Sequence, residues 1–181
     1  MCRPALLLPV LALALGVASA AALVSGAHSQ GATPAADCPV TTDEENEAIA
    51  RRWHEDTING HELAVIDEIV ADDIVHHAGT FPDGVGGDAV KFVLGTLLTG
   101  FPDVQHTIED VVATDDLVII RFTATGTQTG EFQGHAPTGN PATWTGINIF
   151  RLECGRIVEE WSEVDGLGRL EQLGLIGTPT P

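Results

Sequence analysis

The chain has 181 residues, with 26 acidic against 8 basic side chains, and its formal net charge at pH 7 is −18. Proteins bind nucleic acids largely through Lys and Arg that neutralise phosphates, so this composition argues against DNA, RNA or an anionic membrane surface as a partner. The simplest interpretation of the acidity is solubility. The length suits one compact domain.

The first 20 residues have the pattern of a secretory signal peptide. Arg3 precedes an apolar run over residues 5–17, and the small residues Ala-Ser-Ala at 18–20 form a cleavage site. Cleavage after Ala27 is an alternative. Because the apolar stretch continues past residue 20, an uncleaved N-terminal membrane anchor is a further alternative. We therefore expect a secreted or cell-envelope protein, periplasmic or extracellular, with no membrane partner in its mature form.

Residues 21–40 are rich in Ala, Pro and Thr and predict a tether between the signal and the domain. The domain then spans residues 41–176, and residues 177–181 form a tail. Cys38 in the tether and Cys154 in the domain are the two cysteines outside the signal, and in an exported protein they could form a disulfide. The alternative is two free thiols, because the sequence does not give the geometry.

The first half of the domain has the periodicity of helices. Thr42 and Glu45 form a capping box that begins a helix over residues 43–58. A shorter helix is expected over 61–70, and a third from Gly87 to about Leu98. Between the last two, residues 72–79 predict a short strand or extended turn, and 81–88 a loop. His54 and His61 flank the first helix and are expected to be exposed.

The second half has the alternation of strands. Four are expected, over residues 104–114, 117–128, 142–153 and 156–165, and a Gly- and Pro-rich loop at 129–141 separates the second from the third. Helices followed by strands predict an α+β fold. We expect a curved, cone-shaped sheet, antiparallel or mixed, packed on the three N-terminal helices. Such a cone leaves a central pocket for a small apolar molecule.

The last predicted strand has an unusual face. Simple alternation puts Ile157, Glu159, Trp161, Glu163 and Asp165 on one side. If that face is solvent-exposed, the tryptophan gains no burial, and if it lies in the core, the carboxylates are costly. A pocket lined by both apolar rings and carboxylates would account for the combination.

Several segments together resemble the SnoaL-like polyketide cyclases, also called ester cyclases, of the ketosteroid isomerase and scytalone dehydratase superfamily. They are "NGHELAVIDEIVADDIVHH" (59–77), "FPDVQHTIEDVVATDDLVIIRFTATGTQTGEFQGHAPTG" (101–139), "INIFRLECGRIVEEW" (147–161) and "DGLGRLEQLG" (165–174). The resemblance covers about 130 residues. It implies the cone fold, ring closure by intramolecular aldol condensation, and no metal or organic cofactor. It also implies a homodimer.

The resemblance makes Asp165, the aspartate of its W-x-x-x-D pattern, the expected general acid/base. A carboxyl group in an apolar pocket is a better base near neutral pH because desolvation favours its protonated form. Glu163 on the same face would add to this effect. Trp161 would line the pocket beside them.

An enolate formed by Asp165 needs a hydrogen-bond donor on its oxygen. His77 is the expected catalytic donor, and His76, Asn148 and Trp144 are alternatives that would also bind substrate. Because residues alternate along a strand, only one of the two adjacent histidines can face inward. His135, in the 129–141 loop, is a further candidate contact at the pocket mouth.

Other chemistries lack their motifs. The chain has no H-E-x-x-H or paired C-x-x-C spacing for zinc, and no G-x-S-x-G nucleophile elbow. "GVGG" (84–87) lacks the spacing of a dinucleotide site. Three functions remain: a cofactor-independent acid/base enzyme acting on a small apolar carbonyl compound, a non-catalytic module that binds a hydrophobic small molecule, and a dimeric accessory domain. Export, and the absence of any tyrosine, depart from the characterised cyclases.

Overall fold

The computed structural model describes residue 38 and residues 40–177. The predicted signal peptide, most of the tether and most of the tail lie outside these residues. No helix in the described part is long and apolar enough to cross a membrane.

Helix α1 (Asp43–Arg52) begins at the predicted capping box, in which Thr42 accepts from the Glu45 amide and the Glu45 carboxylate accepts from the Thr42 amide. The chain continues as a π-helical segment, η1 (Trp53–Asn59). A π-helix is wider than an α-helix and is often found at functional sites. Trp53 and His54 are both buried in it, so the prediction that His54 is exposed is wrong.

The other helices are short apart from α3. A 3₁₀ turn, η2 (Leu63–Val65), leads into α2 (Ile66–Ile69). Val70, predicted as the end of this helix, is extended and begins the first strand. Helix α3 (Gly87–Gly100) matches the third predicted helix, and α4 (Gly166–Gln172) follows the last strand.

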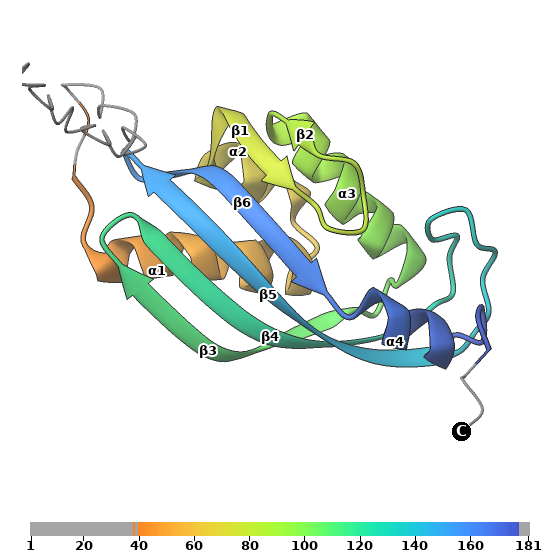
Figure 1. The fold of residues 1–181 in the computed structure, drawn as a ribbon. Coiled ribbons are helices and arrows are strands. Elements are labelled where there is room, and N and C mark those ends of the chain that lie inside the picture. Colours follow the sequence, from red (N-terminus) through yellow and green to blue (C-terminus); the bar gives the residue numbers. More distant parts are fainter. Residues whose placement is uncertain (1–37, 39, 178–181) are drawn as a thin grey trace, which may run out of the picture. The chain divides into compact units, whose positions relative to one another are not determined.

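Six strands form one mixed, curved sheet (Figure 1). They are β1 (Val70–His77), β2 (Gly84–Val85), β3 (Gln105–Thr114), β4 (Leu117–Thr127), β5 (Pro141–Glu153) and β6 (Arg156–Val164). Their order is β2-β1-β6-β5-β4-β3, with β1 parallel to β6 and every other pair antiparallel. The α+β prediction is confirmed, and β2 lies within the segment predicted as a loop.

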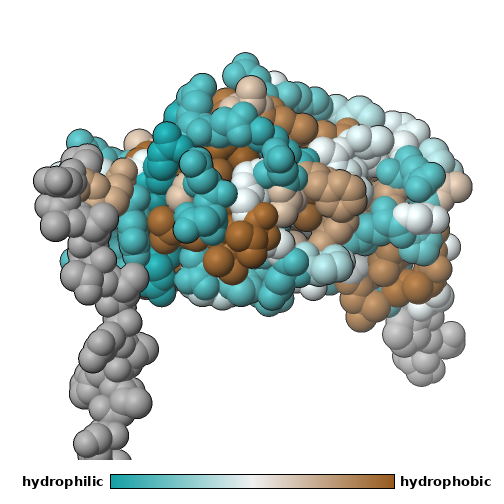
Figure 2. Space-filling model, turned by 90° about the horizontal axis from the view of Figure 1, so that it is seen from above, coloured by the Kyte–Doolittle hydropathy of each residue, from teal (hydrophilic) through white to brown (hydrophobic). Residues whose placement is uncertain are grey.

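Helices α1, α2 and α3 lie on one side of the sheet, and the core fills the space between them and the curved strands (Figure 1). The largest fully buried side chains include Trp53, Phe101, Phe122, Phe132 and Phe150. Seen from above, much of the surface is hydrophilic, in keeping with the acidic composition, with hydrophobic groups between (Figure 2).

A disulfide and a backbone hydrogen bond fix two segments that lie outside the helices and strands. Cys38 and Cys154 form a disulfide, with their Cα atoms 5.1 Å apart, so the pairing left open by the sequence is made. The 129–141 loop is fixed to the end of α3, where the Gly130 amide donates to the Gly100 carbonyl. A Cβ at Gly130 would overlap the carbonyl oxygen of Thr99, so only glycine allows this approach. The loop thereby brings Phe132 over the core.

Candidate active site

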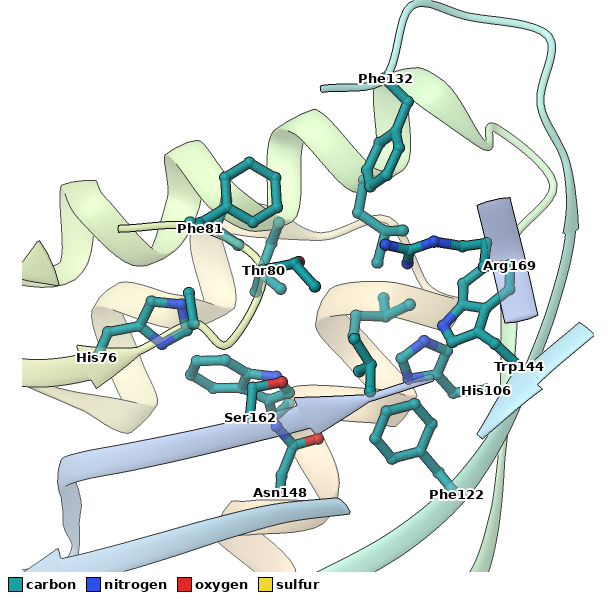
Figure 3. A pocket seen from close by; sticks show the side chains of 17 residues that line it. His76, Thr80, Phe81, His106, Phe122, Phe132, Trp144, Asn148, Ser162 and Arg169 are labelled. Carbon is teal, nitrogen blue, oxygen red and sulfur yellow. The ribbon is translucent and has the colours of Figure 1, made fainter. Parts of the chain in front are cut away.

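A cavity of about 70 Å³ lies between the helices and the concave side of the sheet (Figure 3). Its walls are mainly apolar and aromatic, and a few polar groups converge on it, which is the usual character of a small-molecule site. The residues that line it are Trp53, Ile58, His76, Ala78, Thr80, Phe81, Val93, Leu94, Leu97, His106, Phe122, Phe132, Trp144, Asn148, Ser162, Val164 and Arg169.

A β-bulge in β6 decides which face of this strand meets the cavity. Arg151 pairs with Glu159 and Leu152 with Ile157, so Val158 has no partner on β5. A bulge inserts one residue and reverses the alternation beyond it. Ile157 and Glu160 are therefore both buried, and Ser162 and Val164 line the cavity. The predicted pocket face of this strand is the wrong one.

At the cavity wall, three polar side chains on three strands form a buried array, in which His76 and Asn148 line the cavity and Glu160 lies behind them. Glu160 on β6 is fully buried, and its carboxylate accepts a hydrogen bond from the Asn148 side chain on β5. The other carboxylate oxygen, Oε2, lies 2.6 Å from Nδ1 of His76 on β1. The two atoms are close enough for a hydrogen bond, but the angles between them do not suit one. The contact between His76 and Glu160 is therefore mainly electrostatic. Burial raises the pKa of Glu160, although His76 and Asn148 oppose the rise.

The structure puts His76 inward and His77 outward. His76 shares the face of the buried Ile74 and lines the cavity, whereas His77 contacts Asp83 and Glu159 at 3.0 and 3.2 Å. The hydrogen bond to Asp83 is the main cause of a raised pKa of His77, and Glu159 adds to it. His77 stacks on Trp161 with ring centroids 5.4 Å apart. The predictions that His77 and Trp161 line the pocket are wrong.

The predicted carboxylates also lie outside the cavity. Asp165 is exposed and serves as the N-cap of α4, where Oδ1 accepts from the Gly168 amide at 2.8 Å. Glu163 is exposed on the outer face of β6, and the two acids line only a shallow surface depression. His135 is exposed in its loop and is not part of the cavity lining. The prediction that the Asp165 carboxylate lies inside the cavity is wrong, because this carboxylate binds the backbone at the start of α4.

Besides His76, two predicted contacts have the expected position. Asn148 is almost fully buried and lines the cavity, as does Trp144 on the same strand. They lie four residues apart on β5, with Gly146 between them on the same face. A Cβ at Gly146 would overlap the ring of Phe122, so this glycine lets the phenyl group lie across the sheet and form part of the cavity wall.

A pair of buried histidines was missed from the sequence. Nδ1 of His54 on η1 lies 3.0 Å from Nδ1 of His106 on β3, and His106 stacks on Phe122 with centroids 4.4 Å apart. Burial lowers the pKa of His54 far below its usual value and that of His106 to about 3. Both rings are therefore neutral near pH 7. Alternation along β3, which puts His106 on the face of Ile108, was the available signal.

Arg169 on α4 is the second residue that was missed. It is 4% exposed, and its guanidinium lies over the rings of Phe132 and Trp144 at 4.7 and 5.0 Å. Burial lowers the pKa of Arg169 to about 10, against the opposing charge of Asp165. The available signal was its spacing from Leu173, which lies one turn later and is buried.

A family model, described as SnoaL-like polyketide cyclase, matches residues 48–173. The match includes every strand and all of the cavity lining. The chain belongs to the SnoaL-like polyketide cyclase family.

Several solved structures share this fold. IdmH of Streptomyces antibioticus, a candidate polyketide cyclase, is 34% identical, with 71% of this chain and 98% of IdmH covered and a TM-score of 0.63. AclR of Streptomyces galilaeus, a candidate hydroxylase, is 29% identical over 77% of this chain and 87% of AclR, with a TM-score of 0.68. A SnoaL-like cyclase candidate from Jannaschia sp. CCS1 is 20% identical over 75% of this chain and 94% of its own, with a TM-score of 0.69. No curated protein sequence matches the chain.

In this SnoaL-like domain, Phe81 stands between the cavity and a depression on the surface. The depression is lined by Pro82, Gly84, Phe92 and neighbouring residues, and it shares His76 and Phe81 with the cavity. Phe81 is only half-buried. Phe81 and His76 therefore line both the cavity and the surface depression.

In the described part of the chain, no group of three or more His, Cys, Asp or Glu side chains is arranged to hold a metal ion. The polar groups at the cavity are instead single donors and acceptors on different elements. They can exchange a proton with a bound molecule and stabilise charge on it.

Proposed function

We propose that this protein is an acid/base enzyme that works without a cofactor and removes a proton next to the carbonyl group of a small, largely apolar compound. The observation that carries the proposal is the buried array of His76, Glu160 and Asn148 at the wall of an apolar cavity. It places a potential base beside a cavity with mainly apolar walls.

His76 is the proposed general base. In its ionised form the Glu160 carboxylate can only accept, and it then favours the tautomer of His76 with its proton on Nδ1. Nε2 then has a free lone pair, and within the described residues it has no hydrogen-bond partner. The same division of roles, in which an acid orients a histidine base, operates in hydrolytic triads. Poor alignment in a free enzyme does not exclude a base, because such contacts often tighten when substrate binds.

In the reaction, Nε2 of His76 takes the proton from the carbon next to the carbonyl, and the electron pair moves to the carbonyl oxygen. The enolate oxygen needs a donor that is already in place. Ser162 lies two residues after Glu160 on the same face of β6, and its hydroxyl lines the cavity. We propose Ser162 as this donor. His76 then returns the proton to a carbon or oxygen of the product.

The size and lining of the cavity limit the substrate. The walls include Trp53, Phe122 and Trp144, which suit a flat, unsaturated molecule. A volume of about 70 Å³ favours a compact substrate, or one whose entry displaces Phe81. Family membership and the likeness to IdmH support ring closure by the enolate when a second carbonyl lies within reach.

Proton abstraction can be measured without knowing the natural substrate. In D₂O, we would follow deuterium incorporation next to the carbonyl of 2-tetralone and related aryl ketones by ¹H NMR. Wild type should accelerate the exchange, and His76→Gln and Glu160→Gln should each reduce it by about 10²–10⁴-fold, the usual contribution of a general base. His77→Gln is the matched control and should leave the rate unchanged, because His77 faces outward.

An unchanged rate in His76→Gln would refute the assigned base. Wild type that binds the ketones without exchanging them would favour the alternative of a non-catalytic binding module.

We also propose that the protein is exported. The signal-like residues 1–20 support this, and so does the disulfide between Cys38 and Cys154, since disulfides persist mainly in oxidising compartments. Fractionation of expressing cells, followed by mass spectrometry of the mature N-terminus, tests it. A full-length protein retained in the reducing cytoplasm would contradict it.

A homodimer remains our proposal for the assembly. The sheet face opposite the three N-terminal helices exposes Ile147, which lies beside Glu163 in the pairing of β5 and β6. Light scattering should give twice the mass of one chain, and Ile147→Lys should reduce it. A monomer at all concentrations would exclude the proposal.

A further inference from the structure

Arg169 is a buried cation at the opposite side of the cavity from His76 (Figure 3). The side chain extends from α4 into the space between Phe132 and Trp144 and lies against the faces of both rings. Contacts with ring faces stabilise a cation but leave the N–H groups at the edge of the guanidinium without acceptors.

Protein acceptors for these N–H groups are missing in the described residues. Nε of Arg169 is buried without a hydrogen-bond partner, and no ion pair joins the guanidinium to a carboxylate. Asp165, four residues earlier, acts on it only at a distance because its own carboxylate caps α4. A buried charge is normally paired, so a lone buried arginine in an apolar wall is unusual.

The other basic side chains of the described residues are partnered. Arg156 donates to the backbone carbonyls of Asp67 and Val70. The remaining five all form ion pairs with carboxylates, and they are Arg51, Arg52, Lys91, Arg121 and Arg151. In a chain with so many acids, the lack of a carboxylate at Arg169 sets this residue apart.

We propose that the missing partner of Arg169 is the ligand, and that the ligand is a small apolar carboxylate. A carboxylate matches the planar edge of a guanidinium with two parallel hydrogen bonds. A single negative charge suits these apolar walls better than a phosphate dianion, which would lose more hydration on entry. The inference rests on the proposed function for its use of the cavity. The carboxylate would bind at Arg169 while the reacting carbonyl faces His76.

The test compares acids with uncharged molecules of the same shape. Benzoate, phenylacetate and 3-phenylpropanoate are titrated into the full mature protein by calorimetry, each beside its primary amide. For the best-fitting acid, wild type should bind the carboxylate roughly tenfold or more tightly than the amide, as expected for hydrogen bonds to a charged group. Arg169→Met should bring this ratio close to one.

Arg151→Met is the matched control. Arg151 also lies over a tryptophan, 5.8 Å from the ring of Trp161, but it is on the outer face and pairs with Asp116. Its replacement should leave the carboxylate preference intact. Arg169→Lys keeps the charge but not the planar edge of the guanidinium, and it should retain a reduced preference for carboxylates. If Arg169→Met does not fold, this lysine variant provides the test.

The proposal is overturned if wild type shows no preference for any acid over its amide, if it binds none of the acids, or if the preference survives in Arg169→Met. The binding assay is independent of catalysis. His76→Gln should keep the preference for carboxylates, so failure of the base assignment and failure of the anion site give different results.

Discussion

Replacing Arg169 with methionine should stabilise the protein while it removes the proposed carboxylate site. Burial lowers the pKa of Arg169 to about 10, which corresponds to a cost of roughly 3 kcal/mol for keeping the charge in the folded state. The contacts with Phe132 and Trp144 offset part of this cost, by about 0.5–2 kcal/mol each. Methionine fits between aromatic rings and regains about 0.3–1.5 kcal/mol. We therefore expect the free energy of unfolding to rise by about 1–2 kcal/mol.

Urea denaturation followed by far-UV circular dichroism at pH 7 measures this difference. The folded-state pKa of Arg169 is below that of the unfolded chain, so the penalty is fully present below about pH 10 and decreases only as the pH rises above that value. The difference in the free energy of unfolding between wild type and Arg169→Met should therefore be constant from pH 5 to pH 9. Arg151→Met, whose ion pairs are partly exposed, should change stability by less than about 1 kcal/mol.

A loss of stability in Arg169→Met of more than about 1 kcal/mol would contradict this prediction. The guanidinium would then have a partner in the free protein. The idea that the ligand supplies its missing acceptor would fail with it.

Three further outcomes are expected. Asp165→Ala should lower the free energy of unfolding by about 1 kcal/mol, because it removes the N-cap of α4, whereas Asp165→Asn should be nearly neutral and should keep the exchange activity. The free energy of unfolding should fall as the pH drops from about 6.5 towards 3, because His106 binds a proton in the unfolded chain but not when it is buried. At pH 3 this residue alone accounts for a loss of about 5 kcal/mol. Thermal unfolding of His106→Gln should therefore show a smaller loss of stability at acid pH. Cys154→Ser should lower the free energy of unfolding in urea by about 2–5 kcal/mol, because it removes the disulfide. Dithiothreitol should destabilise wild type but not this variant, and equal effects on both proteins would contradict the disulfide.

Most of the secondary structure could be predicted from local sequence. The capping box at Thr42 and Glu45 sets the start of α1, and alternation of apolar residues gives β3 to β6 with ends correct to within one or two residues. The shorter α2 was not predictable in this way. Val70 is extended because it pairs with Ile157, which is 87 positions later in the chain.

The candidate site was predicted much less well, and β6 explains why. An alternating pattern separates two faces but does not say which of them meets the helices. The unpaired Val158 then reverses the alternation between Ile157 and Glu160, with no signature in composition. The prediction consequently selected Trp161, Glu163 and Asp165 and passed over Glu160.

Local periodicity and motifs spread along the chain are enough to predict the α+β plan, the family and the cavity residues Asn148 and Trp144. The orientation of His76 rather than His77 towards the cavity, and the burial of Arg169 without a counter-ion among the described residues, could not be predicted in this way. Both depend on which partner strand or loop covers a given side chain. These contacts join residues far apart in sequence, and in β6 they also depend on a bulge that leaves no local sequence pattern.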